Sequence, residues 1–305
     1  MKNKILLYIL SFLLFSCEKV LPIHTDIAKQ MTLNAELDTD NKIKVQLFES
    51  ALPGDSLMLQ FISNATVELY ENSNKISTLT YVPDFISSQS SYYGDSTIHI
   101  MPERIYTVKA THPNFPSITA TDTVPPLTTV TNVSVSSLPL YVLNKDSTHG
   151  QLQFTIIDAA SKHNVYMLYP FYYYSRYYKI NATDSVLGWN TEYAQIFTIN
   201  GIKTNNIYED NRIDDAVFNG QSKPFILEIS KLFDADSSII EAYVGISVRQ
   251  YSASFYLDKE SKRQYHALLN NNIYDVPFWF YTNVIGGYGL LTCTSNNNQI
   301  IAKIK

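Results

Sequence analysis

The sequence predicts a mainly β fold, with an N-terminal immunoglobulin-like β-sandwich followed by a larger antiparallel β domain that holds one short helix. Apolar and polar residues alternate with a period of two through most of the chain. Turn-forming residues separate these runs, and only one stretch has a helical period. Short strands at this spacing are typical of antiparallel sandwiches. The 305 residues also exceed one ordinary core, so we expect two domains.

The chain begins with a secretory signal. A lysine-containing start precedes an apolar run from Ile5 to Phe15, which is too short to cross a bilayer as a permanent helix. The residues Leu14-Phe15-Ser16-Cys17 resemble a bacterial lipobox, although Phe15 stands where a smaller residue is usual. We expect residues 1–16 to be removed and Cys17 to carry palmitate and related acyl chains that anchor the protein. The alternative is a plain signal peptide followed by an incidental cysteine.

Charge and cysteine content narrow the classes of partner. The net charge is −5, which gives no electrostatic footprint for nucleic acid or for anionic lipid headgroups. Lipidation of Cys17 would leave Cys293 as the second and last cysteine, so no disulfide can form. Cys293 lies in a strand-like run and is expected to be a small buried hydrophobic residue.

The chain divides at two adjacent prolines, Pro125 and Pro126, which cannot donate to a β-ladder. We expect a tether at residues 17–29, a β-sandwich domain at 30–124 and a C-terminal β domain at 127–305. Alternation predicts a hairpin at 31–37 and 43–47 around a turn at 38–41. Further alternating runs predict strands at 57–61, 65–69, 106–110, 152–157, 165–178 and 244–255.

One helix is expected after residue 260. Ser261 and Gln264 have the spacing of a capping box, with Ser261 as the N-cap. Tyr265, Leu268 and Leu269 then form an apolar stripe of helical period, and three asparagines end it.

The tyrosine-rich run is the candidate ligand or partner surface. It contains Tyr172, Tyr173, Tyr174 and Tyr177, and Trp189 follows on the next expected strand. Alternation cannot place all of these rings on one face, so some should face outward, where they would stack on a sugar or anchor a partner. The alternative is a strand whose two faces are both covered.

Three glycines cluster in the tail at Gly286, Gly287 and Gly289, between apolar runs at 278–281 and 290–291. We expect Gly287 and Gly289 to be structural and to form a hairpin that requires positive φ. The rival interpretation is that they let a ligand approach the backbone.

The sequence contains no recognisable pattern for a metal, a cofactor or a catalytic site. The six histidines show no metal-ligand spacing, and Arg249 replaces the last glycine that a nucleophile elbow requires. Residues 208–215 are rich in oxygen ligands, but a solvated turn is expected there in preference to a calcium site. We therefore expect no metal, no cofactor and no enzymatic activity.

The order of these features resembles domain-of-unknown-function family 4249 over nearly the whole chain after the signal. The resemblance is carried by the motifs 64–69 and 102–110, by Asp158, Asn164 and Tyr166, and by Pro277, Phe278, Thr282, Asn283, Val284, Gly287 and Gly289 in the tail. Leu291 departs from the family, which has an aromatic residue there. The family has no catalytic residues to transfer.

What the resemblance implies is a lipid-anchored outer-membrane accessory or binding protein, a partner of a TonB-dependent transporter in nutrient uptake. It would lie on either the periplasmic or the cell-surface face. Two other classes stay open: a surface glycan-binding protein that uses the tyrosine run, and a hydrolase whose site is assembled from distant residues.

Overall fold

The structure is a computed structural model. It describes residues 28–40, 42–51, 60–84, 90–137, 150–159, 164–181, 184–200, 202–203, 211–215, 218–230, 239–270 and 280–303. The expected signal at 1–16, the lipidated Cys17 and most of the tether therefore lie outside the described residues, as do Pro277, Phe278 and the first part of the oxygen-rich turn.

The elements follow one another in three groups. The first group is β1 (Met31–Asp38), β2 (Lys42–Glu49), β3 (Gln60–Phe61), β4 (Thr66–Glu71), β5 (Asn74–Val82), β6 (Tyr92–Gly94), β7 (Ile105–His112) and β8 (Phe115–Thr123). The second is β9 (Thr129–Ser137), β10 (Gly150–Ile157), β11 (Val165–Lys179), β12 (Ser185–Tyr193), β13 (Ile196–Ile199), β14 (Ile202–Lys203), β15 (Arg212–Asp214), β16 (Ser222–Ile229) and β17 (Ile239–Tyr251). The chain closes with α2 (Ala253–Asn270), β18 (Val284–Ile285) and β19 (Tyr288–Lys303).

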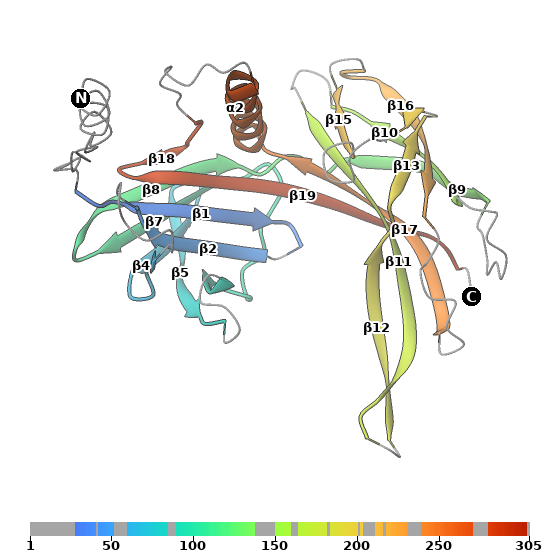
Figure 1. Ribbon diagram of the computed structural model, residues 1–305, viewed down its shortest axis with the longest axis horizontal. Helices are drawn as coiled ribbons and strands as arrows, with labels where there is room; N and C mark the ends of the chain where they lie inside the picture. Colours follow the sequence, from blue (N-terminus) through green and yellow to red (C-terminus); the bar gives the residue numbers. More distant parts are fainter. Residues whose placement is uncertain are drawn as a thin grey trace, which may run out of the picture.

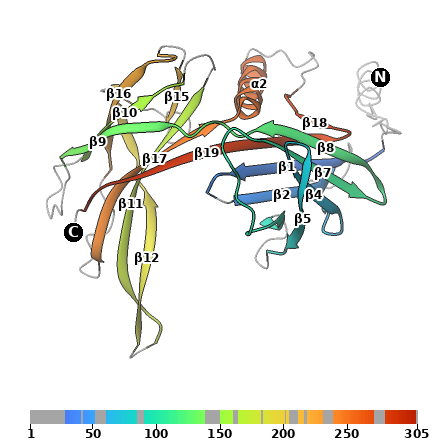
Figure 2. The ribbon, with the colours of Figure 1, turned by 180° about the vertical axis from the view of Figure 1, so that it is seen from behind.

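Most strands join one large sheet, in the order β12-β11-β17-β19-β1-β2-β6-β5-β4-β7-β8-β18, and a small sheet has the order β14-β13-β16-β10-β9. The long strand β19 runs between β17 and β1 and spans both halves of the molecule (Figures 1 and 2). It pairs antiparallel with β17 and parallel with β1. The large sheet is therefore mixed, which corrects the expectation of purely antiparallel pairing, because sequence periodicity does not reveal which distant strand lies alongside.

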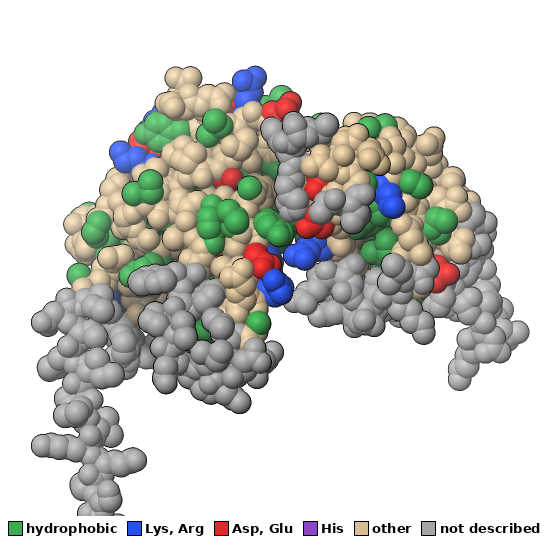
Figure 3. All heavy atoms as spheres, turned by 90° about the horizontal axis from the view of Figure 1, so that it is seen from above, with side chains coloured by type: hydrophobic (Ala, Val, Ile, Leu, Met, Phe, Trp, Pro, Cys, Tyr) green, Lys and Arg blue, Asp and Glu red, His purple; other side chains and the backbone are tan. Residues whose placement is uncertain are grey.

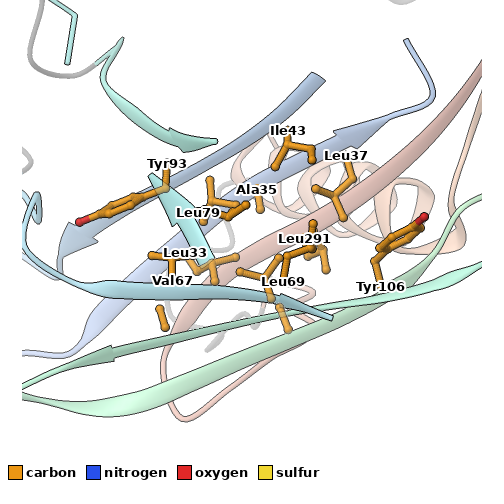
Figure 4. Packing of buried hydrophobic residues seen from close by; sticks show 14 of the residues in the cluster. Leu33, Ala35, Leu37, Ile43, Val67, Leu69, Leu79, Tyr93, Tyr106 and Leu291 are labelled. Atoms are coloured by element: carbon orange, nitrogen blue, oxygen red, sulfur yellow. The ribbon is translucent and has the colours of Figure 1, made fainter. Parts of the chain in front are cut away.

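The first core lies between two layers of the large sheet, as Figure 4 shows. Leu33, Ala35 and Leu37 from β1 face Val67 and Leu69 from β4. The period of two explains this arrangement, since every second residue of a strand points to the same side. Val284, Leu291 and Cys293 also belong to this core, so the C-terminal tail completes it.

The second core lies between the large sheet and the small sheet. Its members come from β11 and β17 on one side and from β10, β13 and β16 on the other. Val248 faces this core and is paired in register with Asn297, which lies an even number of residues beyond Cys293 of the first core. Both cores therefore lie on the same side of β17, β19 and β1. We call the opposite side of these strands, together with that of β2, β11 and β12, the outward face.

The structure confirms some of the local predictions and contradicts others. The hairpin of β1 and β2 is confirmed, with Leu37 opposite Ile43. The helix is confirmed but begins nine residues earlier than expected, at Ala253, and is longer. Ser261 is not its N-cap: inside the helix, its hydroxyl donates to the carbonyl oxygen of Asp258 at 2.8 Å. The start lies at Ser252, whose carbonyl accepts the first helical hydrogen bond from Tyr256.

The coarse fold class is confirmed for the described residues, which form a mainly β structure with one helix. The finer expectation of an immunoglobulin-like sandwich at 30–124 is not confirmed, because the tail strand also enters that core. The domain boundary at Pro125 and Pro126 stays a prediction.

Candidate functional site: an aromatic outward face

The tyrosine run forms β11, and alternation divides its rings between two sides. Tyr166, Tyr172 and Tyr174 belong to the second core. Tyr173 and Tyr177 have the other parity and lie on the outward face. The run is tyrosine-rich on both sides because the core side has polar partners for the phenol groups.

Two of the five expected surface residues are therefore buried. Tyr172 is 2% exposed and Tyr174 is 9% exposed. The Tyr172 hydroxyl donates to the carbonyl oxygen of Ser230 at 2.7 Å, and burial raises the pKa of Tyr172. Neither ring is available to a ligand or partner, and the candidate surface is reduced to Tyr173, Tyr177 and Trp189.

Trp189 and its neighbours form the first aromatic group, which we call the Trp189 platform. The Trp189 ring stacks on Tyr173 with centroids 4.6 Å apart and an interplanar angle of 13°, and Tyr243 lies 6.3 Å from it. Lys303 lies over Tyr243 at 5.7 Å and bonds Glu241 at 2.7 Å. Trp189 keeps 44% of its surface exposed. Such a ring, flat, supported from behind and open in front, is suited to stacking.

A second aromatic group lies farther along β17. The Tyr193 ring lies 5.8 Å from Tyr169, and the Arg249 guanidinium lies 4.8 Å from the centroid of Tyr169. Arg249 also donates to the Tyr193 hydroxyl at 3.3 Å. The Tyr169 hydroxyl lies 3.4 Å from that of Tyr251, which stacks on Phe255 of α2. The two groups make one aromatic stripe along the outward face.

The charge of this second group is fixed. Desolvation lowers the pKa of Arg249, but the hydroxyls of Tyr193 and Tyr251 and the carboxylate of Asp38 outweigh it, so the pKa is raised overall. Burial raises the pKa of Tyr251. Arg249 therefore stays a cation and Tyr251 a neutral hydroxyl at physiological pH.

The hairpin of β11 and β12 extends beyond the rest of the sheet (Figure 1). Pairing of β11 with β17 ends at Arg176, whereas pairing with β12 continues to Lys179. The outer part exposes apolar side chains on both faces: Tyr177 at 58%, Ile180 at 65%, Val186 at 51% and Leu187 at 45%. A two-stranded hairpin is marginal in water by itself, so this projection favours contact with another molecule.

Hydrophobic side chains do not gather in this way everywhere. Seen from above, they stand apart among polar ones over both halves, and charged side chains of both signs lie near the middle (Figure 3). The face that Figure 3 shows therefore carries no continuous hydrophobic stripe.

The tail motif lies on the other side, where it joins β19 to the first core. The Asn283 side chain accepts from the backbone N–H of Leu291 at 2.9 Å and donates to its carbonyl at 2.8 Å. The expected two-stranded hairpin is thus replaced by a side-chain clamp, and β18 pairs with β8 instead. Gly286 has φ +86° and Gly289 has φ +112°. A Cβ at Gly287 would overlap the Met31 carbonyl oxygen, and one at Gly289 the Leu33 carbonyl oxygen.

A buried carboxylate stands beside this clamp. Asp122 accepts hydrogen bonds from the backbone N–H groups of Thr123 at 2.8 Å and Cys293 at 3.1 Å, and from the Ser254 hydroxyl at 3.2 Å. Burial raises the pKa of Asp122 despite these bonds. Burial also holds the pKa of the Cys293 thiol well above its usual value, so this cysteine is not a nucleophile.

The second family motif is also internal. Asp158 accepts hydrogen bonds from the Tyr166 hydroxyl, from the Asn164 side chain at 3.0 Å and from the backbone of Gly220 at 2.7 Å. Asn164 in turn accepts from Gln250 of β17. These buried residues hold the second core together, and they do not open to solvent.

Sequence reasoning missed Tyr169, Tyr193, Tyr243 and Arg249. Three of them come from β12 and β17, and register alone brings them beside β11. A signal was present in β17: Val244, Ile246 and Val248 fill the core, so the residues between them must face outward.

Within the described residues, no group of three His, Cys, Asp or Glu side chains is arranged to hold a metal ion. No helix among these residues has the length and apolar character needed to cross a membrane.

Comparison with known proteins yields a family. No curated protein matches the chain. The family described as Domain of unknown function (DUF4249) matches residues 18–300, nearly the whole chain of 305 residues. The chain therefore belongs to the DUF4249 family.

Proposed function

We propose that this protein is a lipid-anchored, non-catalytic binding protein of the outer membrane and an accessory partner of a TonB-dependent transporter in nutrient uptake. The observation that carries the proposal is the aromatic stripe of the outward face, which keeps Trp189 and Tyr193 about half exposed, with Tyr177 also half exposed on the projecting hairpin beside it. Partly exposed Trp and Tyr side chains are the residues that most often anchor protein contacts. The N-terminal segment ending in Cys17 supports the membrane location.

The projecting hairpin supports a protein partner in particular. Its apolar side chains lie on both faces, so a partner that encloses the hairpin would bury more of them than a flat surface would. Its edge strand β12 contains one charged residue, Glu192, and no proline or lysine. Edge strands that stay unpaired usually carry several charged residues or a proline, which prevent pairing with another chain.

Capture from membranes tests the proposal. The full-length lipidated protein, extracted in mild detergent, should recover a transporter, and the variant Trp189→Ser with Tyr177→Ser should recover much less. Met101→Ser with Ile105→Ser is the matched control, because those two side chains are about equally exposed but lie in the first half. Recovery of no transporter by the unaltered protein, or equal recovery by both variants, would refute the proposal.

Anchoring is tested separately. Cys17→Ser should move the protein from the membrane fraction to the soluble fraction, because the acyl chains attach to that thiol and to its amino group. Retention of the variant in the membrane fraction would contradict a lipid anchor.

A surface glycan-binding protein is the second candidate, and one observation favours it. The parallel stack of Trp189 on Tyr173 presents a supported ring whose open face matches the flat C–H face of a sugar. A glycan array with the purified protein separates this candidate from the first.

A further inference from the structure

Several strand ends meet at one end of the first half of the molecule. β1 and β19 both begin there, since Thr32 at the start of β1 is paired in register with Tyr288. β2 ends beside them, where Glu49 is paired with Met31, and β18 lies next to the first part of β8. We call this end the tip (Figures 1 and 2). Its described segments are 28–30, 49–51, 112–117 and 282–289.

The tip presents apolar side chains to solvent. Ile285 is 77% exposed, the highest value among the large hydrophobic side chains of the described residues. Tyr288, at the start of β19, is 49% exposed. The turn between β7 and β8 adds Pro113 and Pro116, which are also exposed. The fold therefore gathers exposed apolar groups from two turns that are far apart in the sequence.

The turn that carries Ile285 and Tyr288 is fixed in place. Gly286 has φ +86° and lies against the Ser117 carbonyl oxygen, and Gly287 lies against the Met31 carbonyl oxygen. The preceding residue, Val284, fills the first core, so Ile285 has the opposite parity and points away from that core. Packing against β1 and β8 thus holds the exposed side chains at the surface.

The tip also carries little charge. Lys29 and Glu49 form an ion pair at 2.5 Å, and segments 112–117 and 282–289 contain no Lys, Arg, Asp or Glu. The opposite end of the first half exposes charged side chains of both signs: Asp40, Lys42, Glu103 and Arg104. Charged groups are costly to bring into a bilayer, and a nearly uncharged tip avoids that cost.

The chain enters the tip from the expected anchor. β1 begins at Met31, and the segment from Cys17 to Met31 covers at most roughly 50 Å when fully extended, at about 3.6 Å per residue. Acyl chains on Cys17 would therefore hold the start of β1 within this distance of a bilayer. The start of β1 belongs to the tip, so the tip is the part of the described structure that the anchor keeps nearest to lipid.

We propose that the tip is the membrane-facing end of the protein and that Ile285 and Tyr288 enter the interface of the bilayer in which Cys17 is anchored. The inference rests on the lipid anchor proposed above and adds a contact made by side chains. Isoleucine gains free energy on leaving water, and tyrosine is enriched at the headgroup level, where its ring is apolar and its hydroxyl meets water. Two side chains are too few to hold a protein on a membrane, so the acyl chains attach it and the tip sets its orientation.

This orientation holds the Trp189 platform away from the bilayer. Tyr243 of the platform is paired in register with Lys303 at the end of β19, whereas β19 begins at the tip. The 16 residues of β19 span roughly 50 Å at about 3.3 Å per residue. The projecting hairpin of β11 and β12 also lies in the half remote from the tip (Figure 1). A partner would therefore meet the aromatic stripe beyond the lipid headgroups.

Fluorescence quenching by lipid tests the inference. The full-length lipidated protein carries an environment-sensitive fluorophore on Asn114→Cys, an exposed position in the turn between β7 and β8. Cys293 is fully buried and escapes labelling. In phosphatidylcholine vesicles, nitroxide-labelled lipid should quench the fluorophore about twofold or more, because interfacial groups lie at the boundary of headgroups and acyl chains. The same fluorophore on Lys42→Cys, at the opposite end of the first half, should not be quenched.

Two double variants show whether the apolar side chains set the orientation. Ile285→Ser with Tyr288→Ser should reduce quenching at position 114 to the level at position 42. Met101→Ser with Ile105→Ser is the matched control, because its side chains are about half exposed but lie at the opposite end, and it should leave quenching unchanged. Both variants should melt like the unaltered protein, since none of these side chains is buried.

The outcomes separate this inference from the transporter partnership. An unquenched fluorophore at position 114 on vesicle-bound protein, or equal effects of the two double variants, would overturn the inference. A fluorophore shielded from water but not quenched by lipid would indicate a second copy of the chain on the tip and would also overturn it. Protein that fails to join the vesicles would refute the anchor and the inference together. Quenching as expected without capture of a transporter would support the inference and refute the transporter partnership alone.

Discussion

The outward face of the large sheet differs between its two ends. At the β1–β2 end, register places Glu36 opposite Lys44 and Asn34 opposite Gln46. These four side chains are polar or charged, and none carries an aromatic ring. At the β11–β12 end, the corresponding positions hold the rings of Tyr173 and Trp189. Both ends cover a packed core on the other side.

The difference separates stability from function. Apart from Phe48, which is buried against Phe61, the β1–β2 end carries polar residues on its outward face, because the hydrophobic effect acts on the inner side. Aromatic residues at the other end therefore exceed what folding requires. An exposed patch of this kind in a folded protein points to a contact with another molecule.

The largest loss of stability should come from substitutions in the tail, which packs against the first core. Gly289→Val should lower the free energy of unfolding by about 3 kcal/mol or more, because φ is +112° and a side chain would overlap the Leu33 carbonyl. Gly287→Val should also lower the melting temperature. Gly188→Ala on β12 is the control, since its Cβ would meet only the movable ring of Tyr178. Urea unfolding of the anchor-free protein measures the free energy of unfolding of all three variants. An unchanged free energy of unfolding for the two tail variants would contradict a structural role.

Substitution of Asp122 should lower the free energy of unfolding by a smaller amount, and that amount should depend on pH. Its pKa is raised by folding, so its stabilising contribution is complete below about pH 4, the ordinary carboxyl value, and is lost as pH rises through the folded pKa. Asp122→Asn turns an acceptor into a donor facing another N–H, and should cost about 1–3 kcal/mol near pH 4. The gap between the two proteins should shrink toward pH 7. Urea unfolding across this range measures the gap, and widening with pH would contradict the assignment.

The outward face should respond differently. Trp189→Ala removes a half-exposed ring and should change the free energy of unfolding by about 1 kcal/mol or less, while weakening ligand or partner binding. Leu168→Ala, on β11 but fully buried, should cost about 2–5 kcal/mol. Thermal unfolding of both variants measures this difference between the two sides of the sheet. Equal losses of stability would contradict it.

Sequence periodicity was enough to predict β1, β2, β4 and β7 of the first core, because residues such as Leu33, Leu37 and Val45 alternate with polar residues, but it did not predict β5, β6 and β8. It could not predict that β19 pairs in parallel with β1, since that contact joins residues at opposite ends of the chain. The tyrosine run was recognised as a surface candidate, but its parity was not assigned, and Tyr172 and Tyr174 are buried. Tyr193, Tyr243 and Arg249 were missed, because only the register of β12 and β17 brings them beside β11.

A comparison of cross-linking at the two ends of the outward face tests the central claim most directly. A photoreactive amino acid would replace Trp189 in one strain and Glu36 in another, in the lipidated protein in living cells. The account predicts a specific adduct with an outer-membrane protein or a glycan from position 189 and none from position 36, with both proteins present in equal amount. Equal adducts from both positions, or none from position 189, would contradict the claim that the aromatic end is the binding surface.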